Sequence, residues 1–253
     1  MDHPMSSRPL LLTALAVATA LSAAACGGSD TAPDDAPKVA LGPVVAAPDP
    51  LSGSPITDSA ALQSAMLTMD LLPDGFAPIP DPVRDLGMDP APEYDAPDRS
   101  GTDPEACGDV LAPIEQQLPG ASAGAEVRYS GPNFSSLDED AASYPGRGAA
   151  EAFTALQNTF AECAEYSGTD ADGVRVDYRL EGREQNTIGD ASISVRLTID
   201  SGGYTLVSDV VVAVVDSTVV QLVGTGQDAF DPAVVTELAA TAVDRIRGAD
   251  RGV

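Results

Sequence analysis

Two runs of alternating side chains near the middle of the chain constrain its fold more than any other feature. Residues 174–180 alternate apolar and charged side chains, and residues 193–199 alternate apolar and polar ones. A period of two residues indicates β-strands with one buried and one solvent-facing side. The chain must therefore contain a sheet, and one face of that sheet must be polar along these strands.

Two more strands are expected, at residues 204–215 and 218–224, and the links that lead into them are short. The third strand is preceded by Ser201-Gly202-Gly203 and the fourth by Asp216-Ser217. Because connections of two or three residues join antiparallel neighbours, the four strands should form a meander. Residues 210–215 are apolar without alternation, which predicts a central strand covered on both faces.

Helices are expected on either side of this meander. Residues 147–165 place Phe153, Leu156, Phe160 and Cys163 on one face, and residues 232–247 form a helix capped by Asp231. Upstream, the pattern favours short helices after Asp58 and after Cys107, a strand at residues 126–129, and loops at residues 77–105 and at Asp138-Glu139-Asp140. The predicted fold class is α+β: an antiparallel sheet (strand, helix, four-strand meander, helix) with helices packed on one face.

The N-terminal segment predicts export. Arg8 precedes sixteen apolar or small residues, 10–25, which end at Cys26. A membrane-spanning helix needs about 20 apolar residues, so this run fits a signal peptide better. The sequence Leu21-Ser22-Ala23-Ala24-Ala25-Cys26 resembles the lipobox of bacterial lipoproteins. That resemblance implies acylation of Cys26 and attachment to the outer face of the cytoplasmic membrane; the alternative is ordinary secretory cleavage that leaves Cys26 as a free thiol.

Composition and sequence pattern divide the chain into four parts. Residues 1–25 are predicted to be the signal peptide, and residues 26–57, rich in Ala, Pro and Asp, are predicted to be a disordered tether. The α+β domain is expected over residues 58–248, followed by a frayed tail at residues 249–253.

The two cysteines that remain after Cys26 are Cys107 and Cys163. An even pair in an oxidising compartment predicts a disulfide, and the absence of a CxxC motif makes it structural rather than catalytic. The alternative is two buried free thiols.

Charge and residue usage exclude several function classes. The chain has 39 acidic and 13 basic residues, a formal net charge of −26, so nucleic acid is not an expected partner. Its one histidine, His3, lies in the predicted signal peptide, which removes histidine-dependent catalysis and histidine-ligated zinc. No metal, cofactor or catalytic residue is predicted.

Three local motifs resemble functional sites but lack the required context. The GxSxG motif at residues 120–124 has no base to activate its serine, and the GxGxxA motif at residues 224–229 follows an antiparallel strand. Asp170-Ala171-Asp172-Gly173 has its glycine at the fourth position instead of the sixth, so a turn is favoured over a calcium loop.

Two further segments resemble the PknH-type extracellular sensor domain of actinobacteria. They are Leu71-Leu72-Pro73-Asp74-Gly75-Phe76 before the first domain cysteine, and Phe160-Ala161-Glu162-Cys163 before the meander. The resemblance covers residues 58–248, with Phe160 where Trp is common and without a second cysteine pair. It implies an antiparallel sheet flanked by helices, with a cleft for an unidentified ligand.

The sequence thus predicts a lipid-anchored, non-catalytic envelope protein that binds a small molecule or an envelope protein through unknown residues. Two alternatives stay open. A carrier of lipid or another apolar molecule would need a large apolar pocket, and a hydrolase would need a pair of facing carboxylates.

Overall fold

A nine-stranded antiparallel sheet runs through the domain in the computed structural model, which describes residues 40–83, 85–90 and 99–250. The strands follow the order β1-β3-β4-β9-β8-β7-β6-β5-β2 across the sheet. Their bounds are β1 Ala77–Pro78, β2 Gly101–Asp103, β3 Ala123–Ser130, β4 Ser136–Ser143, β5 Glu165–Thr169, β6 Arg175–Arg183, β7 Ala191–Ser201, β8 Tyr204–Val215 and β9 Thr218–Gly226. The predicted α+β class with an antiparallel sheet is confirmed.

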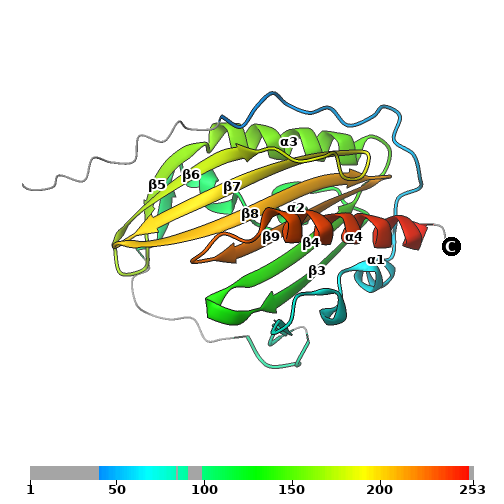
Figure 1. Ribbon diagram of the computed structural model, residues 1–253. Helices are drawn as coiled ribbons and strands as arrows, with labels where there is room; N and C mark the ends of the chain where they lie inside the picture. Colours follow the sequence, from blue (N-terminus) through cyan, green and yellow to red (C-terminus); the bar gives the residue numbers. More distant parts are fainter. Residues whose placement is uncertain (1–39, 84, 91–98, 251–253) are drawn as a thin grey trace, which may run out of the picture. The chain divides into compact units, whose positions relative to one another are not determined.

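The described residues contain four α-helices, which lie on both faces of the sheet (Figure 1). They are α1 Ser59–Ala65, α2 Ile114–Gln117, α3 Gly148–Glu162 and α4 Pro232–Asp250, with short 3-10 turns at Met69–Leu71, Glu105–Asp109 and Pro132–Phe134. Helices α2 and α3 pack in one apolar cluster and α1 and α4 in the other. The expectation that helices cover only one face is therefore wrong.

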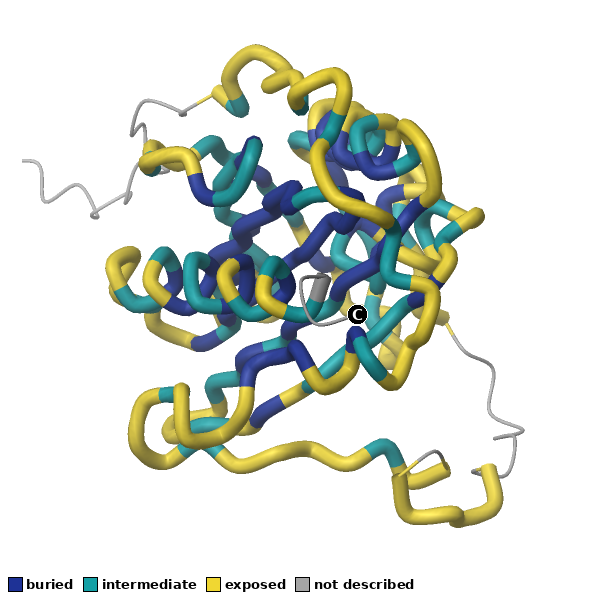
Figure 2. The backbone as a smooth tube through the Cα atoms, turned by 90° about the vertical axis from the view of Figure 1, so that its right-hand side faces the viewer, coloured by how far each residue is buried: buried dark blue, intermediate teal, exposed yellow. Residues whose placement is uncertain are grey.

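Strand β8 explains why two helical layers are needed. Every residue from 210 to 215 is at most 3% exposed. The even-numbered side chains of this stretch belong to the cluster with α3, and the odd-numbered ones to the cluster with α4. Figure 2 shows buried backbone running through the middle of the domain, with exposed segments around it. The predicted central, doubly covered strand is confirmed.

The meander forms with the predicted short connections. Gly202 and Gly203 link β7 to β8 and have φ angles of 57° and 88°, and Asp216, in the link from β8 to β9, has a φ of 53°. Positive φ angles suit the tight hairpin turns that match the twist of the strands. The register Ser201↔Tyr204 follows directly from the two-residue glycine turn.

The segment Asp138-Glu139-Asp140 was expected to be a loop, and this is wrong, because it lies in the middle of β4 between β3 and β9. Its acidic character suggested solvent, but two of its carboxylates accept hydrogen bonds from the backbone of other parts of the chain. Leu67 N–H donates to Glu139, and Ile114 N–H donates to Asp140. The short strand β5, which directly follows Cys163, was not predicted either.

Residues 40–57, predicted as part of the tether, lie against the domain. Leu41, Ala47 and Leu51 pack against the cluster around α3, and Ile56 N–H donates to the Ser143 hydroxyl. Residues 1–39, which include the predicted signal peptide, Cys26 and the rest of the tether, lie outside the described residues, as do residues 251–253.

Candidate functional site

One half of the sheet presents a polar face that none of the described helices covers. Helix α4 packs on β8 and β9, and α1 packs on β3. On the same face, β5, β6 and β7 are left open to solvent, as Figure 1 shows. Along β6 and β7 the outward side chains are the charged and polar members of the alternating runs, with Arg175 and Asp177 exposed. The polar face that the sequence predicted is therefore the open surface of the domain.

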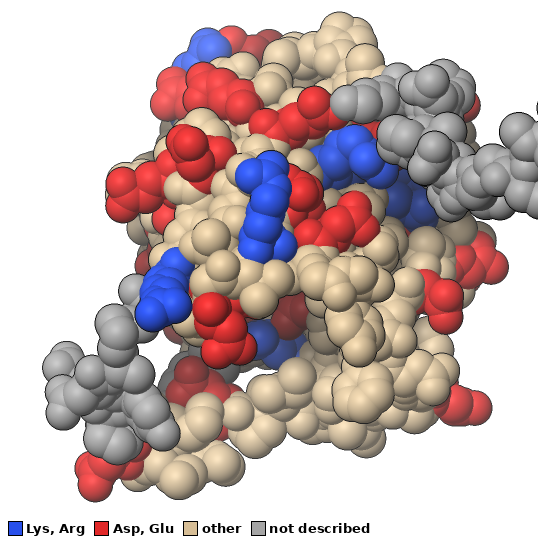
Figure 3. Space-filling view, turned by 90° about the vertical axis from the view of Figure 1, so that its left-hand side faces the viewer, with Lys and Arg blue, Asp and Glu red and all other residues tan. Residues whose placement is uncertain are grey.

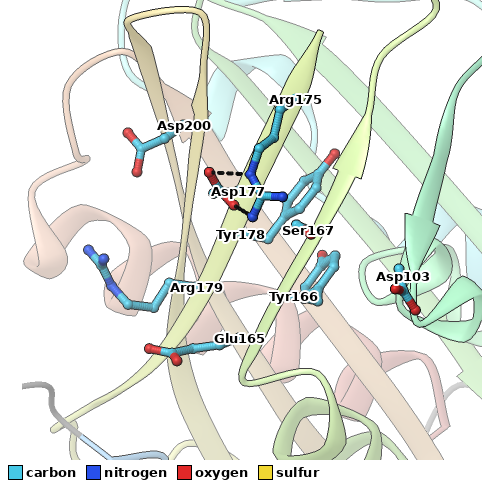
Figure 4. A pocket seen from close by; sticks show the side chains of 9 residues that line it. All are labelled: Asp103, Glu165, Tyr166, Ser167, Arg175, Asp177, Tyr178, Arg179 and Asp200. Carbon is cyan, nitrogen blue, oxygen red and sulfur yellow. Dashed lines mark hydrogen bonds and ion pairs between the residues drawn. The ribbon is translucent and has the colours of Figure 1, made fainter. Parts of the chain in front are cut away.

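A hollow of about 400 Å³ lies on this open face (Figure 4). Its walls come from β2, β5, β6 and β7, which are brought together by the sheet although they span about 100 residues of sequence. The lining residues are Asp103, Glu165, Tyr166, Ser167, Arg175, Asp177, Tyr178, Arg179 and Asp200. The site thus combines two guanidinium groups with four carboxylates on a rigid floor.

The arginines of the hollow are paired along their own strand. Arg175 binds both carboxylate oxygens of Asp177, with Nε 3.1 Å from Oδ2, and this contact raises the pKa of Arg175. Arg179 Nε lies 3.4 Å from Oε1 of Glu181. Because exposed ion pairs contribute only about 0–1 kcal/mol, a charged ligand can replace one partner at little cost. Figure 3 shows basic side chains lying beside acidic ones at the end of the domain that is on the left in Figure 1.

Two stacked tyrosines lie behind the hollow, on the opposite face of the sheet from its charged side chains. Tyr166 of β5 and Tyr178 of β6 are direct cross-strand partners, and their ring centroids lie 4.4 Å apart with the planes 3° from parallel. The rings pack in the cluster with α3, and burial raises the pKa of Tyr166 to about 12. Cross-strand aromatic pairs stabilise a sheet, so this pair holds the register that places Arg175, Asp177 and Arg179.

Other hollows in the described part of the chain differ in chemistry. One of about 670 Å³ lies between α1, α2 and β3 and carries the acids Glu115, Glu126 and Asp140. An apolar space beside α3, lined by Leu41 and Phe160 among others, holds only about 40 Å³. Drug-sized apolar ligands occupy pockets of roughly 300–1,000 Å³, so this space is too small for a lipid tail.

The predicted disulfide between Cys107 and Cys163 is present. Cys107 lies in the turn Glu105–Asp109 and Cys163 is the C-terminal cap of α3. Their Cα atoms are 5.6 Å apart, and both residues are 2% exposed. The bridge therefore ties the end of α3 to the segment that follows β2. Cys26, the predicted lipid attachment site, lies outside the described residues.

Two adjacent acids, Glu139 and Asp140, lie on opposite faces of β4, the first buried and the second partly buried. Glu139 is 2% exposed; one carboxylate oxygen accepts the Leu67 N–H at 2.7 Å, and the other has no hydrogen-bond partner among the described residues. Asp140 accepts hydrogen bonds from Ile114 N–H at 2.7 Å and from Gln221 Nε2 at 3.0 Å. Loss of water around each carboxyl group raises the pKa of both Glu139 and Asp140 to about 7.

The three local motifs have structural roles. Residues 120–124 link α2 to β3, and residues 224–229 end β9 and lead to α4. Asp170 Oδ1 accepts the N–H groups of Asp172 and Val174, which makes the predicted turn before β6. Over the ranges 40–83, 85–90 and 99–250, no group of three or more His, Cys, Asp or Glu residues is placed to hold a metal ion.

Among the helices of the same described ranges, none combines the length and the apolar character that crossing a bilayer requires.

Comparison with known proteins identifies the fold. No family model matches the chain, and no curated protein matches it either. Among solved structures, the extracellular domain of PknH from Mycobacterium tuberculosis aligns with a TM-score of 0.54 and 16% identity, over 78% of this chain and 100% of that one. An uncharacterized protein from Mycobacterium smegmatis aligns with 18% identity over 76% of this chain and 97% of that one, but its TM-score of 0.39 is too low to carry an argument.

The domain therefore shares the fold of an extracellular domain, as the sequence resemblance implied. At 16% identity this likeness establishes the fold alone. The hollow was not predicted, because two of its acids, Asp103 and Glu165, lie on the short strands β2 and β5, and the sequence pattern predicted neither strand. The alternation in residues 174–180 was the signal that could have located its other half.

Proposed function

We propose that the protein is a lipid-anchored, non-catalytic sensor-like domain of the cell envelope that binds a charged small ligand, or a charged group of a protein partner, over β5–β7. The observation that carries this proposal is the hollow between Arg175, Arg179 and the facing carboxylates. It lies on a rigid sheet, it is open, and its ion pairs are exposed enough to exchange partners.

Two further observations support a binding role outside the cytoplasm. The disulfide suits an oxidising compartment, and the fold is that of a bacterial extracellular domain. Within the hollow, Ser167 is the one hydroxyl nucleophile besides the buried tyrosines, and no histidine lies among the lining residues to activate it. Binding without chemistry is therefore the function that this geometry supports best.

The alternative of an apolar carrier has less support. Carriage of a lipid tail would require a large apolar cavity, whereas the 400 Å³ hollow is lined mainly by charged side chains and the apolar space near α3 holds about 40 Å³.

Native mass spectrometry of the exported protein tests the site. We expect a co-purified ligand on the wild type and at least a tenfold lower occupancy in Arg179→Ala, because the variant removes a guanidinium from the hollow. The matched control is Arg128→Ala. It removes an arginine of β3 that is paired with Asp138 of β4, away from the hollow. Equal loss of ligand in both variants, or no loss in Arg179→Ala, would place binding elsewhere.

The anchor is tested separately. Metabolic labelling with an alkyne fatty acid should mark the wild type and should drop to background in Cys26→Ser, because the thiol of Cys26 is the proposed attachment atom. The variant should also move from the membrane fraction to the soluble fraction. If both proteins are labelled equally, Cys26 is not the lipidated residue.

A further inference from the structure

Residues 40–56, here called the strap, cross the outer side of α3 in an extended path (Figure 1). The strap begins beside β6, where the Ala40 carbonyl oxygen would lie only 2.7 Å from a Cβ atom at position 182. Gly182 therefore permits this close crossing. The strap ends at β4, where Ile56 N–H donates to the Ser143 hydroxyl at 2.9 Å.

The centre of the strap is bound by one side chain, Gln157 of α3. Its Oε1 accepts the N–H of Val45 at 2.7 Å, and its Nε2 donates to the carbonyl oxygen of Val45 at 2.9 Å. The same Nε2 donates to the Phe153 carbonyl at 3.1 Å. The amide thus reproduces the reciprocal pair of bonds that two antiparallel strands exchange. Gln157 is 7% exposed on an otherwise apolar helix face, so an unpaired amide there would be costly.

These contacts recognise main chain more than side chains. The side chains of Val44 and Val45 face solvent, with the residues 53% and 38% exposed. The strap is otherwise held by three partly buried apolar residues, Leu41, Ala47 and Leu51, and by an ion pair between Asp49 and Arg147. Near its C-terminal end the Ser52 hydroxyl donates to the Asp216 carboxylate at 2.9 Å, and the Ser217 hydroxyl donates to the Gly53 carbonyl at 3.2 Å. Backbone bonds with pockets for a few side chains are how many domains bind extended peptides.

The attachment is also loose enough to open. The Asp49–Arg147 pair is exposed on both sides, and a hollow of about 720 Å³ lies between the strap and residues 183–186 and 192–194. A further 40 Å³ of apolar space is left unfilled under residues 41–44. Segments with few buried apolar contacts open at a lower free energy than the core around them.

We infer that the groove between α3 and β7 is a binding site for an extended peptide, and that the strap is its resident, displaceable occupant. The partner is an extended segment with the chemistry of the strap. It begins with an apolar residue that takes the place of Leu41. Counted from that residue, a backbone N–H four positions later meets Gln157, and an acid eight positions later meets Arg147. A small apolar residue lies at the sixth position after the first, and a second apolar residue lies at the tenth. This inference is independent of the hollow on β5–β7.

A fluorescein-labelled peptide of residues 40–52 is the probe, and its binding is measured by fluorescence polarisation. The full chain with Leu41→Asp and Val45→Pro should bind it at least tenfold more tightly than the wild type, whose own strap competes. Adding Gln157→Leu to that variant should weaken binding at least tenfold, whereas adding Gln116→Leu, an exposed glutamine on α2, should not. A peptide with an N-methyl group at Val45 should also bind at least tenfold more weakly, because it lacks the N–H donor.

Equal binding of the two peptides, or no binding to the strap variant, would overturn the inference. Hydrogen exchange on the wild type gives an answer even if the strap variant does not fold. The Val45 N–H should be at least a hundredfold less protected than the Val212 N–H of β8. Equal protection of the two would show that the strap opens only with the whole domain, and would also overturn the inference.

Discussion

Cys163→Ser is expected to lower the melting temperature of the purified protein by roughly 5–15 °C, because it removes a bridge worth about 2–5 kcal/mol from a domain of this size. The bridge joins residues separated by 56 positions, and a loop of that length corresponds to about 4 kcal/mol in the chain-entropy description. It also holds the C-terminal end of α3 against the turn Glu105–Asp109. Differential scanning calorimetry under non-reducing conditions measures the change.

Three further cysteine variants test whether the loss of stability comes from the disulfide itself. Cys107→Ser should lower the melting temperature by a similar amount, and the double variant should be no less stable than the single ones, since all three lack the same interaction. Cys26→Ser, which removes the cysteine outside the pair, should leave the melting temperature unchanged. An additive loss in the double variant would mean that each thiol contributes on its own and that no bridge forms in the protein.

The second large effect expected is a loss of stability between about pH 5 and pH 8 that depends on Glu139. Burial raises the folded-state pKa of Glu139 from 4.5 to about 7, so the folded protein holds a proton that the unfolded chain has lost. Stability from this group is therefore full below the unfolded pKa and is lost as the pH rises through 7. A shift of this size corresponds to about 3 kcal/mol.

Glu139→Gln should remove that part of the pH dependence. The glutamine has nearly the same shape and keeps an oxygen for the Leu67 N–H, but it cannot ionise. The variant should be more stable than the wild type at pH 8, with a smaller difference at pH 5. Urea unfolding at both pH values measures this difference, and Glu162→Gln, on an exposed position of α3, serves as the control. A difference between wild type and Glu139→Gln that does not change with pH would contradict the raised pKa.

The groups around Glu139 are consistent with a raised pKa of its carboxyl group. Tyr129 donates its hydroxyl to the Leu67 carbonyl at 2.7 Å, and Arg245 directs its guanidinium to the carbonyl groups of Ser64, Ala65 and Met66 instead of to the acid. Among the described residues, none forms an ion pair with the Glu139 carboxyl group, so the effect of burial outweighs the attraction of the nearby Arg245 charge. Asp140, on the other face of β4, has its pKa raised to about 7 as well, so Asp140→Asn should flatten the curve in the same direction.

Several elements of the fold follow from local pattern. The alternation in residues 174–180 and 193–199 predicted β6 and β7, and the glycine turn at residues 202–203 predicted their antiparallel continuation into β8. Period-two and helical spacing depend on which side chains face the core, and that information is present in each short window of sequence. Cysteine count and compartment together predicted the bridge that is present.

The elements that were missed share one physical cause, since their partners come from distant parts of the chain. Asp138-Glu139-Asp140 forms a strand because Leu67, Ile114 and Gln221 supply hydrogen bonds that no local pattern contains. The strap is ordered because Gln157, 112 residues away, binds its backbone. A tether and a docked strap have the same composition, so composition could not distinguish them.

Sequence by itself therefore determined the class of fold, the central place of β8 and the disulfide. These depend on the burial of apolar side chains at regular intervals and on the pairing of two cysteines. Only the tertiary structure decided that helices cover both faces, that Glu139 is buried in β4, and that Asp103, Glu165 and Arg179 surround one hollow. The reason is that polar groups become buried or gathered through hydrogen bonds and strand pairings of long range, and the residues that provide them are neighbours only after the chain has folded.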